Sequence, residues 1–232
     1  MTIQAQGVDA GTLPPDSVRT MFDRIAPVYD LMNRVMTAGL DQRWRRLTAA
    51  DVVRPGDRVL DACCGTGDLA VAATRAGAEV TGLDFSERML ERARRKSAAI
   101  AWVEGDLLSL PFEDGSFDAA TVGFGVRNVA DLPRALSELA RVLVPGGRLG
   151  ILEITTPRGP FAPFYRLWFD RIVPVLGKLL RRGDAYEYLP ASVRRFPGPD
   201  ELSALLHGVG LGHVRYRLFA GGIVALHTGE KP

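Results

Sequence analysis

The stretch VLDACCGTGDLA, residues 59–70, constrains the fold more than any other part of this chain. It has the pattern of an apolar strand end, a loop containing Gly65 and Gly67, and the start of a helix. Glycine permits tight, left-handed backbone and leaves no side chain in the way of a ligand. A loop of this kind between a strand and a helix is where open α/β sheets bind nucleotide-like ligands. The stretch therefore predicts an α/β domain with a ligand site at the carboxyl ends of its strands.

The bulk composition predicts one large domain. The 232 residues are 47% hydrophobic and 24% charged, with a net charge of +2, so a sizeable core is expected and a nucleic-acid partner is not. Cys63 and Cys64 are adjacent, which suits free thiols in a reducing cytoplasm better than a disulfide. No apolar run approaches the roughly 18 residues of a membrane span, and the first residues lack the basic and apolar regions of a secretory signal. We expect a cytoplasmic protein with a mobile tail over residues 1–15.

From Arg58 to the C-terminus, strand patterns alternate with helix patterns. Strands are expected over residues 58–62, 79–83, 99–104, 117–124, 148–154, 214–219 and 223–228, and helices over 68–75, 87–96, 131–143 and 200–207. Repeated βα units predict an α/β fold of about seven mostly parallel strands with helices on both faces. Three further helical patterns precede the first strand and exceed what the sheet core can hold. Residues 16–54 are therefore expected to form a helical lid on a single domain of residues 16–232.

The glycine loop alone does not decide which nucleotide-like ligand it binds. Gly65, Gly67 and Ala70 fit the pattern G-x-G-x-x-A, and Asp84 follows Gly65 after 19 residues, which is a weak dinucleotide signal. Asp61 argues against a dinucleotide, because a carboxylate at the strand end would repel a pyrophosphate. The same carboxylate suits a cationic ligand, such as one carrying the ammonium and sulfonium groups of S-adenosylmethionine.

Acidic residues also end the next two expected strands. Asp84 can accept hydrogen bonds from two ribose hydroxyls, and Asp106 can reach the adenine amino group directly or through the neighbouring backbone. Each acid alone could equally be a turn or helix-cap residue, but three on one sheet edge beside the glycine loop favour a cofactor cleft. The histidines have no metal-ligand spacing, so no metal site is predicted. The candidate cofactor-binding residues are Asp61, Gly65, Thr66, Gly67, Asp84, Phe85, Asp106, Leu107 and Gly123.

Several uncommon motifs follow one another along the chain. They are YDLMN at 29–33, GTGDLA at 65–70, FGVRNV at 124–129, RVLVPGGRLGILEIT at 141–155, AYEYLPASVRRFP at 185–197 and GGIVALHTGEK at 221–231. In these motifs the chain closely resembles the ubiquinone/menaquinone biosynthesis C-methyltransferase family, from about Phe22 to its C-terminus. It departs from the family's usual His near Asp41, Lys at Val144, and Ser at both Gly123 and Thr155. The change at Gly123 removes a hydroxyl beside the expected pocket and bears on the choice of quinone more than on the reaction.

The resemblance implies a Rossmann-like class I S-adenosylmethionine-dependent methyltransferase that methylates a ring carbon of a prenylated quinol, with demethylmenaquinol as the expected acceptor. Arg127 is the expected partner of the ring oxyanion because its guanidinium stays charged; an ion pair with a surface acid is the alternative. Asn128 is expected to donate a second hydrogen bond, or else to cap the next helix. Tyr29 is expected to orient the other hydroxyl or relay its proton, or else to pack in the lid. Water, Asp106 and Tyr29 stay open as proton acceptors.

The segment of residues 157–198 interrupts the βα pattern and is expected to be a cover insertion. Within it, residues 161–182 are aromatic, basic and amphipathic, which suits shielding of a polyprenyl tail or contact with the inner face of the cytoplasmic membrane. The alternative is a helix pair packed on the sheet or against a second copy of the chain, which would make a homodimer. Competing functions are C- or O-methylation of another small aromatic or lipid substrate, a catalytically silent cofactor-binding scaffold and, least favoured, an NAD-dependent dehydrogenase.

Overall fold

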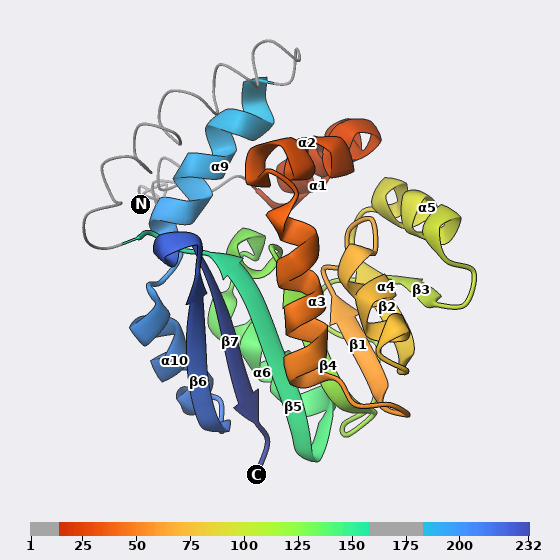
Figure 1. The fold of residues 1–232 in the computed structure, drawn as a ribbon, viewed down its shortest axis with the longest axis vertical. Helices are drawn as coiled ribbons and strands as arrows, with labels where there is room; N and C mark the ends of the chain where they lie inside the picture. The colour runs from red at the N-terminus through yellow and green to blue at the C-terminus, as the bar shows by residue number, and fades with distance from the viewer. Residues whose placement is uncertain (1–13, 158–182) are drawn as a thin grey trace, which may run out of the picture.

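A seven-stranded sheet forms the centre of the computed structural model, which describes residues 14–157 and 183–232 (Figure 1). Its strand order is β3-β2-β1-β4-β5-β7-β6. Strands β1 to β5 pair in parallel, and β7 runs antiparallel to both β5 and β6. The predicted seven-stranded, mostly parallel α/β fold is thereby confirmed. The strands are β1 (Arg58–Ala62), β2 (Glu79–Asp84), β3 (Ala101–Glu104), β4 (Phe117–Gly123), β5 (Leu143–Ile154), β6 (Gly212–Phe219) and β7 (Val224–Glu230).

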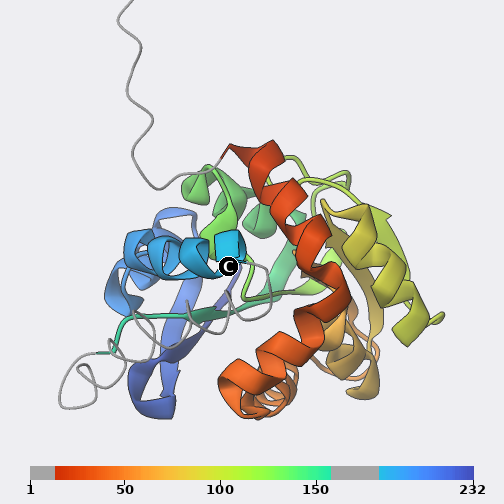
Figure 2. The ribbon, with the colours of Figure 1, turned by 90° about the horizontal axis from the view of Figure 1, so that it is seen from above.

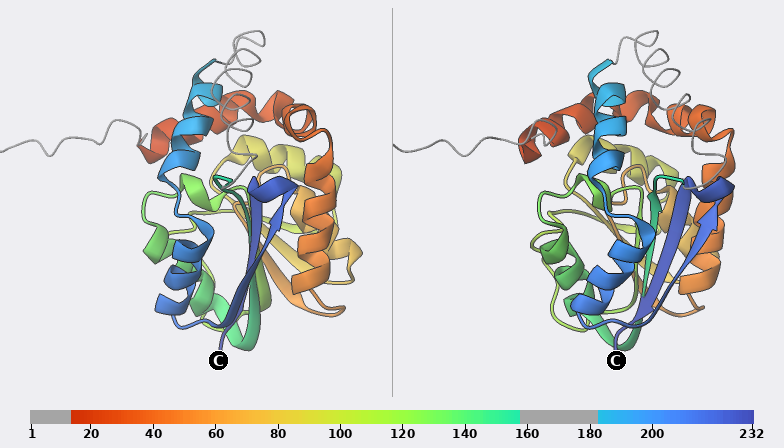
Figure 3. Two further views of the ribbon diagram at one scale, coloured as in Figure 1. Left: turned by 60° about the vertical axis from the view of Figure 1, so that its left-hand side comes forward. Right: turned by 90° about the vertical axis from the view of Figure 1, so that its left-hand side faces the viewer.

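Helices cover both faces of the sheet (Figures 1 and 3). One face carries α3 (Leu40–Val52), α4 (Asp68–Arg75) and α5 (Glu87–Lys96); the other carries α6 (Leu132–Val142) and α10 (Pro199–Gly208). Side-chain caps begin two of these helices. The Ser86 Oγ accepts a hydrogen bond from the Met89 N–H at 3.2 Å, and Asp131 Oδ1 accepts one from the Arg134 N–H at 3.0 Å. These caps fix where the chain leaves the strand ends and so shape the loops that follow β2 and β4.

A third group of helices lies over the carboxyl edge of the sheet (Figure 2). It consists of α1 (Pro15–Ile25), the 3₁₀ turn η1 (Ala26–Val28), α2 (Tyr29–Thr37) and α9 (Gly183–Arg195). Polar contacts tie α1 and α2 to the sheet layer: Ser86 Oγ donates to Asp23 Oδ1 at 2.6 Å, and Lys96 Nζ lies 2.7 Å from Asp30 Oδ2. The segment expected as a lid thus divides in two. Its first part lies over the strand ends, whereas α3 packs on the sheet face, where Gly150 leaves room for Val52.

Other element boundaries differ from the sequence-based expectations. The helical lid, expected from residue 16, begins with α1 at Pro15, because proline suits the first helical turn. Helix α9 was not predicted as a helix, and Pro190 lies inside it. Residues 1–13 of the predicted tail and residues 158–182 of the predicted cover lie outside the described residues. In the described ranges, no helix combines the length and apolar character that a membrane crossing requires.

Candidate active site

The glycine loop lies at the carboxyl ends of β1 and β4, between which the strand order reverses. This switch point is where open α/β sheets leave a crevice for ligands. Gly65 and Gly67 have φ of +55° and +82°, the left-handed backbone that the sequence predicted. The loop after β4 approaches closely: a Cβ on Gly125 would lie 2.4 Å from the Cys63 Cβ. Two loops far apart in sequence therefore meet at this point.

Two residues of these loops adopt left-handed backbone without being glycine. Cys63 has φ +51° and Phe124 has φ +62°. Such conformations are sparsely populated for bulky side chains and cluster at functional sites. Both residues line a cavity, and the sequence analysis assigned neither of them to the site. Burial raises the pKa of the Cys63 thiol well above its usual value, which keeps it protonated and unreactive.

A cavity of about 670 Å³ opens at the ends of β1 to β4. It is called the larger cavity below. Of the nine predicted cofactor-binding residues, five line it: Gly65, Asp84, Phe85, Asp106 and Leu107. The carboxyl ends of three adjacent parallel strands, β1, β2 and β3, bring them together, as expected for strand ends that meet at one sheet edge.

Asp84, the last residue of β2, is buried and lines the larger cavity. Its Oδ2 accepts a hydrogen bond from the Gly65 N–H at 2.8 Å, and its Oδ1 accepts one from the Ser86 N–H at 3.0 Å. Burial raises the pKa of Asp84 to about 6, although the backbone donors oppose that shift. Each carboxylate oxygen still has a lone pair for a ligand hydroxyl, because an ionised carboxylate offers about four acceptor sites.

Asp61 lies below the loop and lines neither this cavity nor the second one described below. Its side chain is buried, and Oδ1 accepts a hydrogen bond from Thr121 Oγ1 at 2.9 Å. Its Oδ2 has no hydrogen-bond partner among the described residues. Burial raises the pKa of Asp61 to about 7. Its predicted attraction for a cationic ligand would therefore act across the loop rather than by direct contact.

Three predicted cofactor residues also line neither cavity. Thr66 Oγ1 donates to Asp30 and accepts from Lys96 Nζ at 2.9 Å, so it ties the loop to α2 and α5. Gly67 has a packing role, because a Cβ there would lie 2.4 Å from the Trp102 ring. A Cβ on Gly123 would lie 3.1 Å from both Arg45 Nη1 and Leu69 Cδ2.

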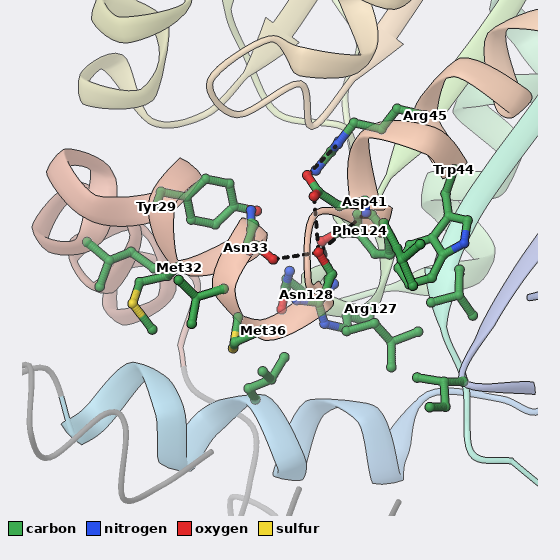
Figure 4. A pocket seen from close by; sticks show the side chains of 18 of the residues that line it. Tyr29, Met32, Asn33, Met36, Asp41, Trp44, Arg45, Phe124, Arg127 and Asn128 are labelled. Carbon is green, nitrogen blue, oxygen red and sulfur yellow. Dashed lines mark hydrogen bonds and ion pairs between the residues drawn. The ribbon is translucent and has the colours of Figure 1, made fainter. Parts of the chain in front are cut away.

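A second, smaller cavity of about 380 Å³ lies between the helices over the sheet edge and α3 (Figure 4). Its wall is mostly apolar, with Met32 and Met36 from α2 and Trp44 from α3. Six residues line both cavities: Phe22, Tyr29, Phe124, Arg127, Asn128 and Tyr188. All three predicted catalytic residues belong to this shared wall. The structure therefore brings them to the boundary between two adjoining cavities.

Arg127 is held in place by a buried acid on β5. Its side chain is 8% exposed, and Nη1 lies 2.8 Å from Glu153 Oε1 and also donates to the Phe124 carbonyl. Burial lowers the pKa of Arg127, but Glu153, with Tyr29 and Tyr188, outweighs that effect, and the pKa is raised overall. The alternative of an ion pair is confirmed in part: Arg127 does pair with an acid, but that acid, Glu153, is 1% exposed and not on the surface. Glu153 is a site residue that the sequence analysis missed, because only strand pairing places it beside the FGVRN loop.

The other two predicted catalytic residues also have defined surroundings. The helix-cap alternative for Asn128 is wrong, because Asp131 caps α6. Asn128 Oδ1 is buried without a hydrogen-bond partner among the described residues. Tyr29 opens α2, and its ring packs edge-on against Phe22 with centroids 6.3 Å apart. Tyr188 of α9 joins the same wall, and no sequence pattern marked it.

The larger cavity fits S-adenosylmethionine in the chemistry of its donors and acceptors. Asp84 would hold the ribose hydroxyls, Gly65 lines the cavity without a side chain, and Asp106 also lines it. The unpartnered, buried oxygens of Asp61 and Asn128 provide negative potential near a cation. Among the described residues, no cluster of His, Cys, Asp or Glu could bind a metal ion.

Comparison with known proteins identifies the family. The model of the ubiE/COQ5 methyltransferase family matches residues 11–231. The chain belongs to that family. It is 48% identical to the demethylmenaquinone methyltransferase of Thermus thermophilus over 222 residues, which cover 91% of this chain and all of the relative. It is 42% identical to the demethylmenaquinone methyltransferase of Staphylococcus aureus over 225 residues, 93% of each chain.

Solved structures support the methyltransferase fold. A Thermotoga maritima S-adenosylmethionine-dependent methyltransferase, described as a possible histamine N-methyltransferase, superposes with a TM-score of 0.65 at 23% identity and covers 92% of this chain and 99% of its own. The [4+2]-cyclase SpnF superposes with a TM-score of 0.71 at 20% identity, covering 95% and 97%. Because a cyclase shares the fold, the fold alone does not decide the reaction. Family membership does: the chain belongs to a methyltransferase family, which implies that it uses S-adenosylmethionine.

Proposed function

We propose that this enzyme transfers a methyl group from S-adenosylmethionine to a ring carbon of demethylmenaquinol, and that the two cavities hold the two substrates. We call the larger one the donor cavity and the smaller one the acceptor cavity. The single observation that carries the proposal is their shared wall, where Arg127 and Asn128 line both. Methyl transfer needs the acceptor carbon in line with the methyl group, and two cavities that adjoin at one wall suit that positioning task.

Arg127 is proposed to stabilise negative charge on the quinol oxygen beside the reacting carbon. The carbon becomes a strong nucleophile when that hydroxyl loses its proton, so a fixed cation nearby lowers the barrier. Glu153 holds the guanidinium by its Nη1 atom, and Nε is buried without a partner among the described residues. A preorganised donor in an apolar cavity acts more strongly than one in water. S-adenosylmethionine supplies the electrophilic methyl group when it is bound.

Tyr29 is the best placed of the three candidates for handling the proton. Asp106 lines the donor cavity but not the acceptor cavity, whereas Tyr29 lines both. We therefore favour Tyr29, with or without water, as the group that orients the hydroxyl and relays its proton.

The proposal includes a route for the prenyl tail toward a membrane surface. Val35 and Leu40 line the acceptor cavity and are also 52% and 41% exposed, so that cavity reaches the surface between α2 and α3. Leu31 beside them is 61% exposed, and Arg34 and Arg43 are exposed nearby. Apolar side chains flanked by arginines suit the interface of an anionic bilayer. We propose that this enzyme works at the cytoplasmic face of the membrane through this surface, named the α2–α3 tip.

The decisive experiment is a methyl-transfer assay with isotope-labelled S-adenosylmethionine and chemically reduced demethylmenaquinone. We expect a labelled methyl group on a ring carbon, and no transfer when the quinone is left oxidised. Demethoxylated ubiquinol precursors and simple naphthols serve as comparison substrates. Label on oxygen, or turnover confined to a comparison substrate, would contradict the proposed acceptor.

A further inference from the structure

Arg45 is a buried arginine for which the described residues provide no hydrogen-bond acceptor. Its side chain is 6% exposed, and Nε is buried without a partner. The nearest carboxylate oxygen is Asp41 Oδ2, at 3.8 Å from Nε, which is an ion-pair distance but too long for a hydrogen bond. The Asp41 oxygens instead accept hydrogen bonds at 3.0 Å from Thr37 Oγ1 and Gln42 Nε2. A buried guanidinium without acceptors is unfavourable, so this arrangement suits a ligand that supplies one.

The same side chain lines the acceptor cavity, and Figure 4 shows it paired with Asp41 on α3. Among the described residues that line this cavity, only Arg45 and Arg127 carry a positive charge. Both contact Phe124: the Arg45 guanidinium carbon lies 5.1 Å from the ring centroid, and Arg127 Nη1 donates to the carbonyl. The two cations therefore both contact one residue of the shared wall, Arg45 at its ring and Arg127 at its carbonyl.

Gly123 gives the Arg45 guanidinium its space. A Cβ at this position would approach Nη1 to 3.1 Å, closer than ordinary van der Waals contact. The serine that the family pattern usually has there would crowd the guanidinium in its present position. The departure at Gly123, expected from the sequence to act by losing a hydroxyl, thus also makes room for a cation beside the acceptor cavity.

We propose that Arg45 binds the second ring oxygen of the quinol, across the ring from the oxygen that Arg127 stabilises. This inference rests on the proposed function, because it takes the smaller cavity as the acceptor site. A 1,4-quinol carries one oxygen on each side of its ring, and two cations from different elements match that arrangement. Asp41 keeps the guanidinium oriented and leaves its donors free. Arg45 would thereby select acceptors with a second hydroxyl over simple phenols.

Two other partners for Arg45 are outcomes of the test. The donor's amino-acid carboxylate is also an anionic oxygen ligand, although Arg45 lines the acceptor cavity and not the donor cavity. Arg45 could alternatively serve only to balance nearby acids, since its charge opposes the raised pKa of Asp61 and helps Lys96 to lower that of Asp68.

The test is isothermal titration of Arg45→Gln, Arg45→Lys and Gly123→Ala with three probes. The probes are 1,4-dihydroxynaphthalene under reducing conditions, 1-naphthol, which lacks the second oxygen, and S-adenosylhomocysteine. We expect Arg45→Gln to weaken binding of the dihydroxy probe about 10- to 100-fold and that of 1-naphthol by less than about threefold. The affinity of Arg45→Lys for the dihydroxy probe should lie between those of the wild type and Arg45→Gln. Lysine keeps the charge but lacks the planar set of donors of a guanidinium. Gly123→Ala should weaken binding of the dihydroxy probe without removing a charge.

Arg148→Gln is the matched control. Arg148 is also buried, also has an unpartnered Nε among the described residues, and pairs with Asp57 away from both cavities. The Arg148→Gln variant should bind all three probes as tightly as the wild type does. Circular dichroism should show that each variant is folded.

Equal losses for the two naphthols, or a loss confined to S-adenosylhomocysteine, would overturn the inference. So would unchanged binding of the dihydroxy probe by folded Arg45→Gln. Methyl transfer by the wild type is measured in the same preparation. Its absence would remove the proposed function, whereas unchanged probe binding beside normal wild-type turnover would remove only the role of Arg45.

Discussion

The donor and acceptor cavities are built from different kinds of structure. Loops that directly follow parallel strands line much of the donor cavity, and Gly65, Asp84 and Asp106 are each within a few residues of a strand end. The acceptor cavity is lined by side chains of α1, α2, α3 and α9, together with the loop after β4. Its residues are brought together by packing across long sequence separations. The donor cavity thus depends on local backbone geometry, and the acceptor cavity depends on how separate helices dock.

This difference predicts how substitutions in the two regions behave. Changes at strand-end loops should alter donor affinity, and changes on the helices should alter the acceptor. Only substitutions in the shared wall should slow the chemical step while leaving the affinities for both substrates unchanged. The predictions below test that division, in order of decreasing effect.

Replacement of Arg127 should give the largest loss of catalytic rate. Arg127→Ala should lower kcat by about 10³-fold, because it removes the cation that faces the developing oxyanion. The affinity for S-adenosylhomocysteine, measured by titration, should stay within about threefold of the wild type. Arg58→Ala, at the opposite edge of the sheet, is the control. Full turnover by folded Arg127→Ala would remove the oxyanion role.

Replacement of Asp84 should act on the donor alone. Asp84→Asn should weaken S-adenosylhomocysteine binding about 100-fold, because it removes charge-assisted hydrogen bonds to the ribose. Binding of a dihydroxynaphthalene probe should be unchanged, since Asp84 lines only the donor cavity. Equal losses for both ligands would mean that the cavities do not act separately.

Acidification should affect donor binding and apoprotein stability in opposite directions. The pKa of Asp84 is raised to about 6 and that of Asp61 to about 7. Because the native state binds these protons more tightly than the unfolded chain, their contribution to the free energy of unfolding increases as pH falls from about 7 toward 4. Donor binding needs the ionised Asp84 carboxylate, so its affinity should fall about tenfold per pH unit below pH 6.

Titrations with S-adenosylhomocysteine and urea unfolding, both between pH 8 and 5, measure the two trends. Wild type and Asp84→Asn should be compared at each pH, because other groups also titrate. The stability of the wild type relative to Asp84→Asn should increase on acidification. A donor affinity that does not change between pH 8 and 5 would contradict the role assigned to these carboxylates.

The smallest effect concerns the α2–α3 tip. Val35→Ser should reduce partitioning onto vesicles containing anionic lipid by about three- to tenfold, because a valine side chain contributes about 1 kcal/mol or slightly more when buried. Co-sedimentation measures the effect, and Leu218→Ser, an exposed apolar residue on β6, is the control. Equal reductions for the two variants, or no vesicle binding by the wild type, would contradict the membrane proposal.

The same contrast explains what the sequence could predict. The strand ends and the glycine loop are local signals, and the structure confirms these elements. Glu153 and Tyr188 could not be placed from the sequence, because strand pairing and helix docking bring them to the shared wall. The motif FGVRN marked Arg127 only through the family resemblance, since nothing local shows which carboxylate will pair with it.

Asp61 and Gly123 show how position along a motif can mislead. Both lie at the end of a strand, as the sequence predicts, but neither lines a cavity. Asp61 is buried behind the glycine loop, and Gly123 lies next to the Arg45 guanidinium. Which strand-end positions face a cavity depends on tertiary packing, which no short motif specifies.

The central claim is that the donor and acceptor cavities adjoin at the wall formed by Tyr29, Phe124, Arg127 and Asn128. A bisubstrate compound, with a naphthol ring joined to the adenosyl group by one or two methylenes at the position of the methyl group, tests this directly. If the cavities adjoin, titration should show binding at least about 100-fold tighter than that of S-adenosylhomocysteine, because the second group then binds at high effective concentration. Binding no tighter than that of S-adenosylhomocysteine would contradict the claim.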